Sequence, residues 1–221
     1  MSVLLAILWK DLVTEWRSRD RITAMLLFSL LVVMVFHFSL PGGATRETQS
    51  SAPGLLWIAY VFAALLGLNR SFSLELENDA LAGIALSPVD RGWIFLGKTA
   101  ANWVVLGVAQ AITGCVFALV FDLDLAVVAF RLALVVGLGS LGLCSVGTLF
   151  AAVAVRTRFR EVMLPLLLLP LLVPVLLGAV RATAGLIENG TLAFEPVQLL
   201  LVTDAIYLIV SFLVFDYVLD E

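Results

Sequence analysis

LELENDALAGIALSPVDRGWIFLGK, residues 74–98, is a polar stretch between two long apolar runs, at residues 53–72 and 99–121. Each run has about 20 residues, which is the length of α-helix that crosses ~30 Å of hydrocarbon. The stretch itself carries four acidic side chains, and these are costly to place in lipid. We therefore predict two transmembrane helices joined by a segment that lies outside the lipid.

The first part of this stretch has the pattern of an amphipathic helix. Leu74, Leu81, Ile84 and Ala85 fall near one helical face. Ser87 and Pro88 then end the helix, because proline lacks an amide hydrogen and restricts the residue before it. We interpret the segment as a docking element at the membrane surface that engages a partner. The polar side chains that lie largely off the apolar face are Glu75, Glu77, Asn78 and Asp79.

The composition of the whole chain excludes an ordinary soluble domain. Of the 221 residues, 62% are hydrophobic and 14% are charged, whereas soluble domains carry about 25% charged residues. The chain is therefore predicted to be an all-α, polytopic membrane protein with one transmembrane domain, residues 1–221. The net charge of −4 says little about partners, because lipid and not nucleic acid covers most of such a surface.

An interfacial helix and six spans are predicted along the chain. In residues 2–20, apolar side chains recur every four residues from Leu4 to Trp16, and Asp11 lies off that stripe. This segment is too polar to span, so we expect it to lie in the membrane interface. A polar loop is expected to precede the last span. The spans are expected at residues 22–40, 53–72, 99–121, 126–155, 162–180 and 198–219.

The basic residues give the orientation. If both termini are cytoplasmic, ten Lys and Arg side chains lie inside and three lie outside, which is the bias of the positive-inside rule. Residues 74–98 are then cytoplasmic, where a nucleotide-hydrolysing partner could reach them. The inside set is Lys10, Arg17, Arg19, Arg21, Arg70, Arg91, Lys98, Arg156, Arg158 and Arg160, and the outside set is Arg46, Arg131 and Arg181.

Residues 92–99, GWIFLGKT, match the pattern G-x-x-x-x-G-K-[ST] of a phosphate-binding loop. We reject this match, because such a loop follows a buried strand and presents bare backbone amides to the phosphate. Here the variable positions are large apolar residues and a transmembrane span follows. We interpret the stretch as the interfacial entry into the third span, with Trp93 and Lys98 as anchors.

Two spans have unusual composition. The fourth carries Ser140, Cys144, Gly147 and Ala151 at helical spacing, and small residues let helices approach closely in lipid, so we favour tight packing over a pore lining. The fifth contains three prolines, each of which frees a backbone carbonyl. It is either a bent packing helix or a hinge or substrate-facing wall. The three are Pro165, Pro170 and Pro174.

Few polar side chains lie within the spans. Asn102 and Gln110 are expected to face protein, and Asp204 is expected near the outer end of the sixth span. His37 is the only histidine, so it is a candidate haem ligand only if a partner supplies a second one. The chain contains no G-x-S-x-G or H-E-x-x-H motif. We therefore predict that it is not an enzyme and binds no cofactor or metal of its own.

Short motifs along the chain resemble those of one family. They are Pro53-Gly54, Trp57-Ile58-Ala59, Leu65-Leu66, Arg70, Phe72, ELENDAL at 75–81, LSPVDR at 86–91, LGK at 96–98 and LPLLLLPLLVP at 164–174. With them the chain resembles the cytochrome c maturation protein B family (CcmB, haem exporter protein B), the membrane subunits of ABC transporters whose ATPase is a separate chain. The likeness covers nearly the whole length. One departure is Ala82-Gly83, where many relatives carry an acid at the first position.

The resemblance implies a subunit of the bacterial inner membrane that works with the ATPase CcmA. CcmC and CcmD, which handle haem for the chaperone CcmE, are implied as further partners, and a second copy of this chain is another candidate. ATP would be bound by the ATPase, and haem would be the transported or handled substrate. The family leaves open whether this subunit conducts haem or transmits ATP-driven motion that releases the loaded chaperone. The lack of a second histidine favours the latter.

The mechanism expected from this resemblance is that the ATPase moves the docking segment, and the segment moves spans two and three. Bending at the prolines would accompany that motion. Two alternatives remain: the permease of another ABC exporter, for a lipid, drug or polysaccharide, or a membrane scaffold that transports nothing. The residues expected to transmit the motion are Glu75, Glu77, Asp79, Asp90 and Arg91.

Overall fold

The computed structural model describes residues 3–40, 46–72, 90–123, 127–154 and 160–218, and within these ranges every regular element is an α-helix. Six of the helices are long and apolar enough to cross a membrane. The predicted all-α, polytopic fold is confirmed. The helices are α1 (Val3–Ser18), α2 (Asp20–Ser39), α3 (Arg46–Asn69), α6 (Arg91–Val120), α7 (Ala129–Ala154), α8 (Arg160–Asn189) and α9 (Phe194–Val218).

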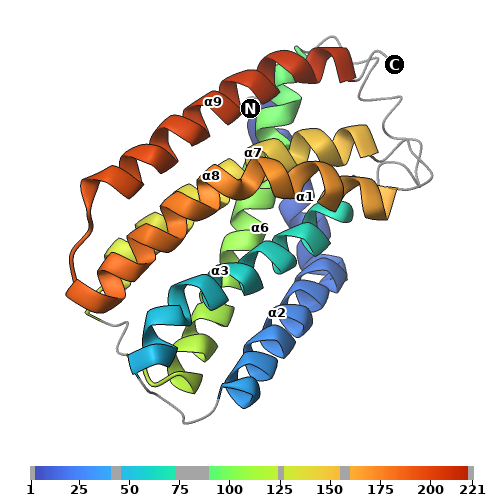
Figure 1. The fold of residues 1–221 in the computed structure, drawn as a ribbon. Helices are drawn as coiled ribbons and strands as arrows, with labels where there is room; N and C mark the ends of the chain where they lie inside the picture. The colour runs from blue at the N-terminus through green and yellow to red at the C-terminus, as the bar shows by residue number, and fades with distance from the viewer. Residues whose placement is uncertain (1–2, 41–45, 73–89, 124–126, 155–159, 219–221) are drawn as a thin grey trace.

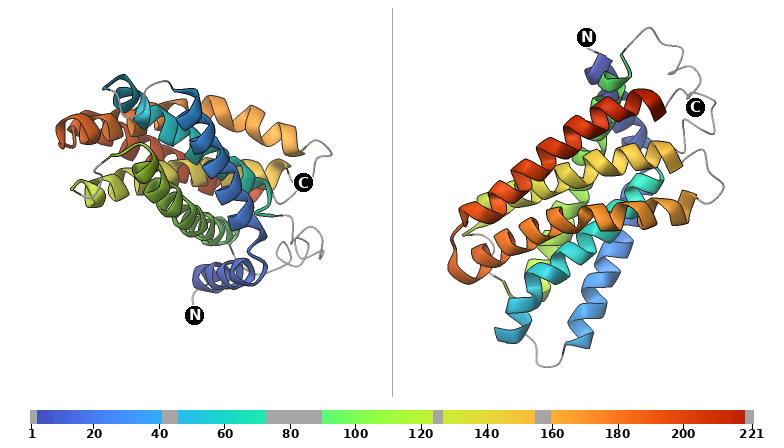
Figure 2. Two further views of the ribbon diagram at one scale, coloured as in Figure 1. Left: turned by 90° about the horizontal axis from the view of Figure 1, so that it is seen from below. Right: turned by 45° about the horizontal axis from the view of Figure 1, so that its top comes forward.

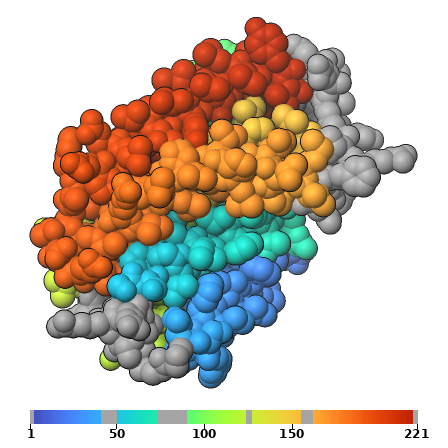
Figure 3. Space-filling view, viewed as in Figure 1, coloured from blue at the N-terminus to red at the C-terminus, as the bar shows by residue number. Residues whose placement is uncertain are grey.

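The six long helices form one bundle (Figure 1). On one face α9, α8, α3 and α2 lie side by side in that order, as the space-filling view shows (Figure 3). α6 and α7 lie behind them, and α7 packs against α6, α8 and α9. Two clusters of buried apolar side chains fill the interior, one toward each end of the bundle.

α1 is set at the edge of this bundle. It runs across the end of α6 and does not continue the direction of α2 (Figure 2, left). The change of direction occurs at Arg19, whose φ of 57° lies in the left-handed region. Trp9 and Trp16 are exposed on α1, which suits tryptophan side chains at the depth of lipid headgroups.

Several helices extend beyond the predicted spans. α3 begins at Arg46, with Pro53 inside it, and α6 begins at Arg91. α8 continues to Asn189, so the polar loop predicted from residue 181 is wrong over most of its length. Hydropathy marks where a helix leaves the hydrocarbon, whereas backbone hydrogen bonds continue for further turns until a capping residue or glycine ends them.

The small residues of α7 let side chains of neighbouring helices approach its backbone closely. A Cβ added at Gly139 would overlap Trp57, and one at Gly147 would overlap Leu68. Ser140, Cys144 and Ala151 are buried in the same helix. The predicted tight packing of the fourth span is therefore confirmed, and small residues here do what they do in other membrane bundles.

α8 is one continuous helix that contains Pro165, Pro170 and Pro174. The Tyr207 hydroxyl of α9 donates a hydrogen bond to the Leu171 carbonyl, one residue after Pro170, whose carbonyl loses its helical donor at Pro174. This bond ties α9 to the proline-containing part of α8. The role of the three prolines as a hinge stays a prediction.

The polar residues within the spans are distributed partly as expected. Asn102 and Gln110 are buried against protein, as predicted. The position predicted for Asp204 is wrong: it lies against Gly142, in the middle of α7, and only 3% of it is exposed. The helix that carries Asp204 begins earlier than the predicted span, which moves this side chain toward mid-depth.

Candidate functional site

A buried ion pair holds α1 against the start of α6. Lys98 Nζ lies 3.1 Å from Asp11 Oδ2, and the lysine side chain is only 2% exposed. Glycine at position 97 makes this approach possible, because an added Cβ would lie 3.0 Å from the Cβ of Ile7. The interfacial helix is thus fixed to the bundle by charge as well as by apolar contact.

Lys98 also contacts the end of α3. Its Nζ donates to the carbonyl of Ser71 over 3.3 Å and lies 4.8 Å from the centroid of the Phe72 ring. Ser71 and Phe72 are the last described residues before residues 73–89. One ammonium group on α6 therefore contacts both α1 and the residues that follow α3. The end of α3 and the start of α6 are the two elements on either side of residues 73–89.

Asn102, one turn after Lys98 on α6, connects four segments. Its Oδ1 accepts hydrogen bonds from Arg21 Nη1 and from Ser71 Oγ, each at 2.9 Å. Its Nδ2 donates to Thr148 Oγ1 of α7, also at 2.9 Å. Each polar atom of this amide is used, as burial requires. Asn102 extends the connection from the docking side into the α7 core.

Glu15 and Arg21 close the network on the α1 side. Arg21 Nε lies 2.9 Å from Glu15 Oε2 as an ion pair, without the alignment of a hydrogen bond. Glu15 Oε1 accepts from the backbone amide of Ile22 at 3.1 Å. The carboxylate thereby spans the break between α1 and α2. We call the connected set the α1 polar network: Asp11, Glu15, Arg21, Ser71, Lys98, Asn102 and Thr148.

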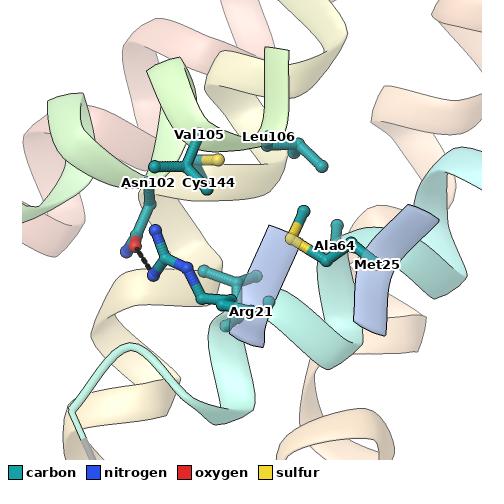
Figure 4. A pocket seen from close by; sticks show the side chains of 9 residues that line it. Arg21, Met25, Ala64, Asn102, Val105, Leu106 and Cys144 are labelled. Atoms are coloured by element: carbon teal, nitrogen blue, oxygen red, sulfur yellow. Dashed lines mark hydrogen bonds between the residues drawn. The ribbon is translucent and has the colours of Figure 1, made fainter. Parts of the chain in front are cut away.

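A small pocket lies beside this network, between α2, α3, α6 and α7. Arg21 and Asn102 provide its polar wall, and the hydrogen bond between them crosses it (Figure 4). Met25, Leu106 and Cys144 are among the apolar and weakly polar side chains on the other walls. The pocket leaves a small space beside the Arg21–Asn102 bond, where the four helices meet.

The structure places two of the five predicted coupling residues. Asp90 caps α6, because its carboxylate accepts from the Gly92 amide at 2.9 Å. Arg91 Nη1 donates to the backbone carbonyl of Asp216 in α9 at 2.9 Å. Glu75, Glu77 and Asp79 lie outside the described residues. Asp90 and Arg91 therefore fix the start of α6 and tie it to the end of α9.

Two sequence interpretations of this region need correction. Lys98 is not an exposed interfacial anchor, because it is buried in the network described above. The inward face of α1 is not the predicted apolar stripe alone: Glu15 is buried, whereas Trp16 is 75% exposed. The GWIFLGKT stretch lies inside α6, which differs from the strand–loop–helix arrangement of a phosphate-binding loop.

Sequence reasoning missed most of the α1 polar network. One signal was available, since Asp11 and Glu15 are four residues apart and therefore share a helical face. Their partners could not be found in this way, because Lys98 and Asn102 are far away in the sequence. His37, the candidate haem ligand, lies at the other end of α2, edge-on to Phe38 and Phe121 with ring centroids 5.4 and 5.9 Å away.

The fold and this network define a class of protein: a multi-pass helical membrane protein with a surface helix ion-paired to the bundle. The family model described as CcmB protein matches residues 2–217. The chain belongs to the CcmB family.

Curated relatives agree with this assignment. Heme exporter protein B of Paracoccus denitrificans is 31% identical over 204 residues, which is 92% of this chain and 90% of the relative. Heme exporter protein B of Bradyrhizobium diazoefficiens is 28% identical and covers 96% of this chain and 94% of its own length. The protein of the same name from Pseudomonas aeruginosa is 32% identical over 76% of each chain. The similarity therefore covers the interfacial helix as well as the spans.

Proposed function

We propose that this chain is the membrane subunit of an ABC transporter complex for haem export or haem delivery in cytochrome c maturation. Membership of the CcmB family and the names of the curated relatives support this proposal. In this complex the chain does not hydrolyse ATP; a separate ATPase subunit, CcmA, binds and hydrolyses it. CcmC and CcmD are the other membrane partners, and CcmE is the haem chaperone that the complex serves.

The complex lies in the bacterial inner membrane, with both termini of this chain in the cytoplasm. The ends of the helices support this arrangement. The end with the α1 polar network carries Lys10, Arg21 and Lys98, whereas the opposite end carries Arg131, which donates to the Gly190 carbonyl at 2.7 Å. The positive-inside rule then puts the α1 end and residues 73–89 on the side of the ATPase.

The single observation that carries the coupling mechanism is that Lys98 joins α1 to the helices on both sides of residues 73–89. A push on this segment by the ATPase acts on the end of α3 and the start of α6. Both elements are held by the same buried ammonium and by Asn102, so their displacement also moves α1 and α7. Glu75, Glu77 and Asp79 would receive the motion, while Asp90 and Arg91 pass it to α6 and α9.

Haem is the substrate of this proposal, and release of the haem-loaded chaperone is the step that the motion drives. His37 is the one candidate for contact with haem iron, and it requires a second axial ligand from a partner. In the described residues no group of three or more His, Cys, Asp or Glu side chains is placed to hold a metal ion. The proposed role is therefore transmission of motion, with bending of α8 at Pro165, Pro170 and Pro174.

The test combines charge reversal with recovery of the ATPase. The variant Glu75→Lys/Glu77→Lys is expected to lose co-purification of CcmA and to abolish haem-loaded CcmE release in cells. Glu188→Lys is the matched control, because Glu188 is an exposed acid at the C-terminal end of α8, away from the α1 end of the bundle. Recruitment of CcmA that is unchanged in the double variant contradicts the docking assignment.

Deletion of the gene separates the proposal from its two alternatives. Loss of c-type cytochromes, restored by the wild-type chain, supports the haem role. Normal c-type cytochromes with a co-purified ATPase point to an exporter of a lipid, drug or polysaccharide. Normal c-type cytochromes with no ATPase attached point to a scaffold.

A further inference from the structure

Asp204 stands apart from the α1 polar network. It lies within α9, it is 3% exposed, and neither of its carboxylate oxygens has a hydrogen-bond partner among the residues that the structure describes. Buried polar groups in helical membrane proteins are normally paired with side chains or backbone. An unpartnered carboxyl group in the middle of the bundle therefore requires an explanation.

The surroundings of Asp204 are nearly apolar. On α7 it faces Gly142, where an added Cβ would overlap Oδ1, and Val175 of α8 approaches the same point. On its own helix the titratable neighbour is Tyr207, whose hydroxyl is used by the Leu171 carbonyl. Basic side chains on α6 and α7, which pack against α9, contact other groups. Lys98 is ion-paired with Asp11, Arg91 donates to the backbone carbonyl of Asp216, and Arg131 donates to the backbone carbonyl of Gly190.

We propose that Asp204 is a proton-binding site in the interior of the membrane domain. While α7 and α9 are packed together, the group is a neutral carboxylic acid, because no residue described around it compensates a negative charge. When the two helices separate, water reaches the carboxyl group and it releases the proton to that water. The site takes up and releases one proton as the α7–α9 contact closes and opens.

Gly142 couples the protonation of Asp204 to the packing of α7 against α9. Only a residue without a side chain lets α7 come this close to the carboxyl group, so the contact excludes water from Asp204. A larger residue at this position would hold α7 and α9 apart and admit water. The proposal concerns the state of this chain alone and does not depend on the substrate of the complex.

Infrared spectroscopy of the purified protein in lipid tests the proposal. The carbonyl stretching band of a protonated carboxylic acid is expected at neutral pH and is expected to be lost in Asp204→Asn, which is isosteric and neutral. Asp216→Asn, which removes an exposed carboxylate from the same helix, is the matched control and is expected to retain the band. Absence of the band from the wild-type protein at neutral pH, or its persistence in Asp204→Asn, overturns the proposal.

A second measurement tests the coupling to packing. In Gly142→Ala the acid band is expected to disappear at a lower pH than in the wild-type protein, because water reaches the carboxyl group. Gly107→Ala, at a glycine with open space around it, is expected to titrate like the wild-type protein. An unchanged titration in a folded Gly142→Ala variant overturns the coupling. If that variant does not fold, titration of wild-type protein with ¹³C-labelled aspartate decides whether the buried acid is protonated at neutral pH.

Discussion

Lys98 on α6 and Asp11 on α1 form an ion pair with a 3.1 Å separation. The pair lies on the inward side of α1, whereas Trp9 and Trp16 of the same helix are exposed. The same lysine donates to the carbonyl of Ser71 and lies over the ring of Phe72, two residues that follow α3. The ion pair therefore sets the position of α1 relative to the start of α6.

Replacement of Lys98 by Met is expected to destabilise the folded protein by about 1–3 kcal/mol, because Asp11 and the buried Ser71 carbonyl both lose the ammonium group that they contact. Thermal unfolding in detergent measures the change. Lys10→Met is the control: Lys10 also lies 3.0 Å from Asp11, but its side chain is 49% exposed, so a loss of about 0–1 kcal/mol is expected. Equal effects of the two substitutions would contradict a structural role for the buried pair.

Substitution of Asn102 by Leu is expected to cost about 1–3 kcal/mol for each buried polar group left without a partner. Arg21, Ser71 and Thr148 each lose a hydrogen bond in this variant. Asn102→Asp keeps the oxygen that accepts from Arg21 and Ser71, so it is expected to be markedly less destabilising. The same unfolding measurement ranks the two variants, and the reverse order would show that Asn102 does not organise the network.

Gly139→Ala is expected to destabilise the bundle by about 1–3 kcal/mol, because the added methyl group overlaps Trp57. Trp57 cannot move freely, since its Nε1 donates to Thr183 Oγ1 at 3.0 Å. Gly107→Ala, which meets no neighbour within 4 Å, is the control, and alanine there is expected to be neutral or slightly stabilising. A neutral Gly139→Ala variant would show that the close approach of α3 to α7 is dispensable.

A disulfide between Ile7→Cys and Gly97→Cys is expected to join α1 covalently to α6 and to leave ATP turnover by the proposed complex unchanged, because the two helices already move together through the Lys98–Asp11 ion pair. The added Cβ at position 97 would lie 3.0 Å from that of residue 7, close to the ~3.5–4.5 Å of disulfides. Cys115 and Cys144 are free, so the experiment uses a background with both replaced by Ser or Ala.

The control cross-link joins α2 to α3, through Met25→Cys and Gly67→Cys, which also face each other but lie away from α1. A loss of ATP turnover in the fully cross-linked Ile7–Gly97 variant, with recovery on reduction, would show that α1 moves relative to α6 during the cycle and would contradict rigid coupling through Lys98.

Local sequence alone determined the six membrane spans and their helical class. A run of about 20 apolar residues forms an α-helix in lipid, because the helix satisfies the backbone hydrogen bonds within the segment. The small residues of α7 and the burial of Asn102 and Gln110 followed from the same physics. Helix ends were harder, since Arg46, Arg91 and Asn189 bound helices that continue past the hydrophobic run.

Only the tertiary structure decided which distant side chains meet. Hydropathy and periodicity describe a single helix, so they cannot pair Asp11 with Lys98 or bring Asn102 to Arg21 and Thr148. Nor could they reveal that Asp204 is buried against Gly142, with no hydrogen-bond partner in the part of the chain that the structure describes. The sequence by itself determined that this chain crosses the membrane as six helices. The packing of those helices decided where its buried charges lie, because a charge in lipid is tolerated only where another segment of the chain reaches it or where it is neutralised.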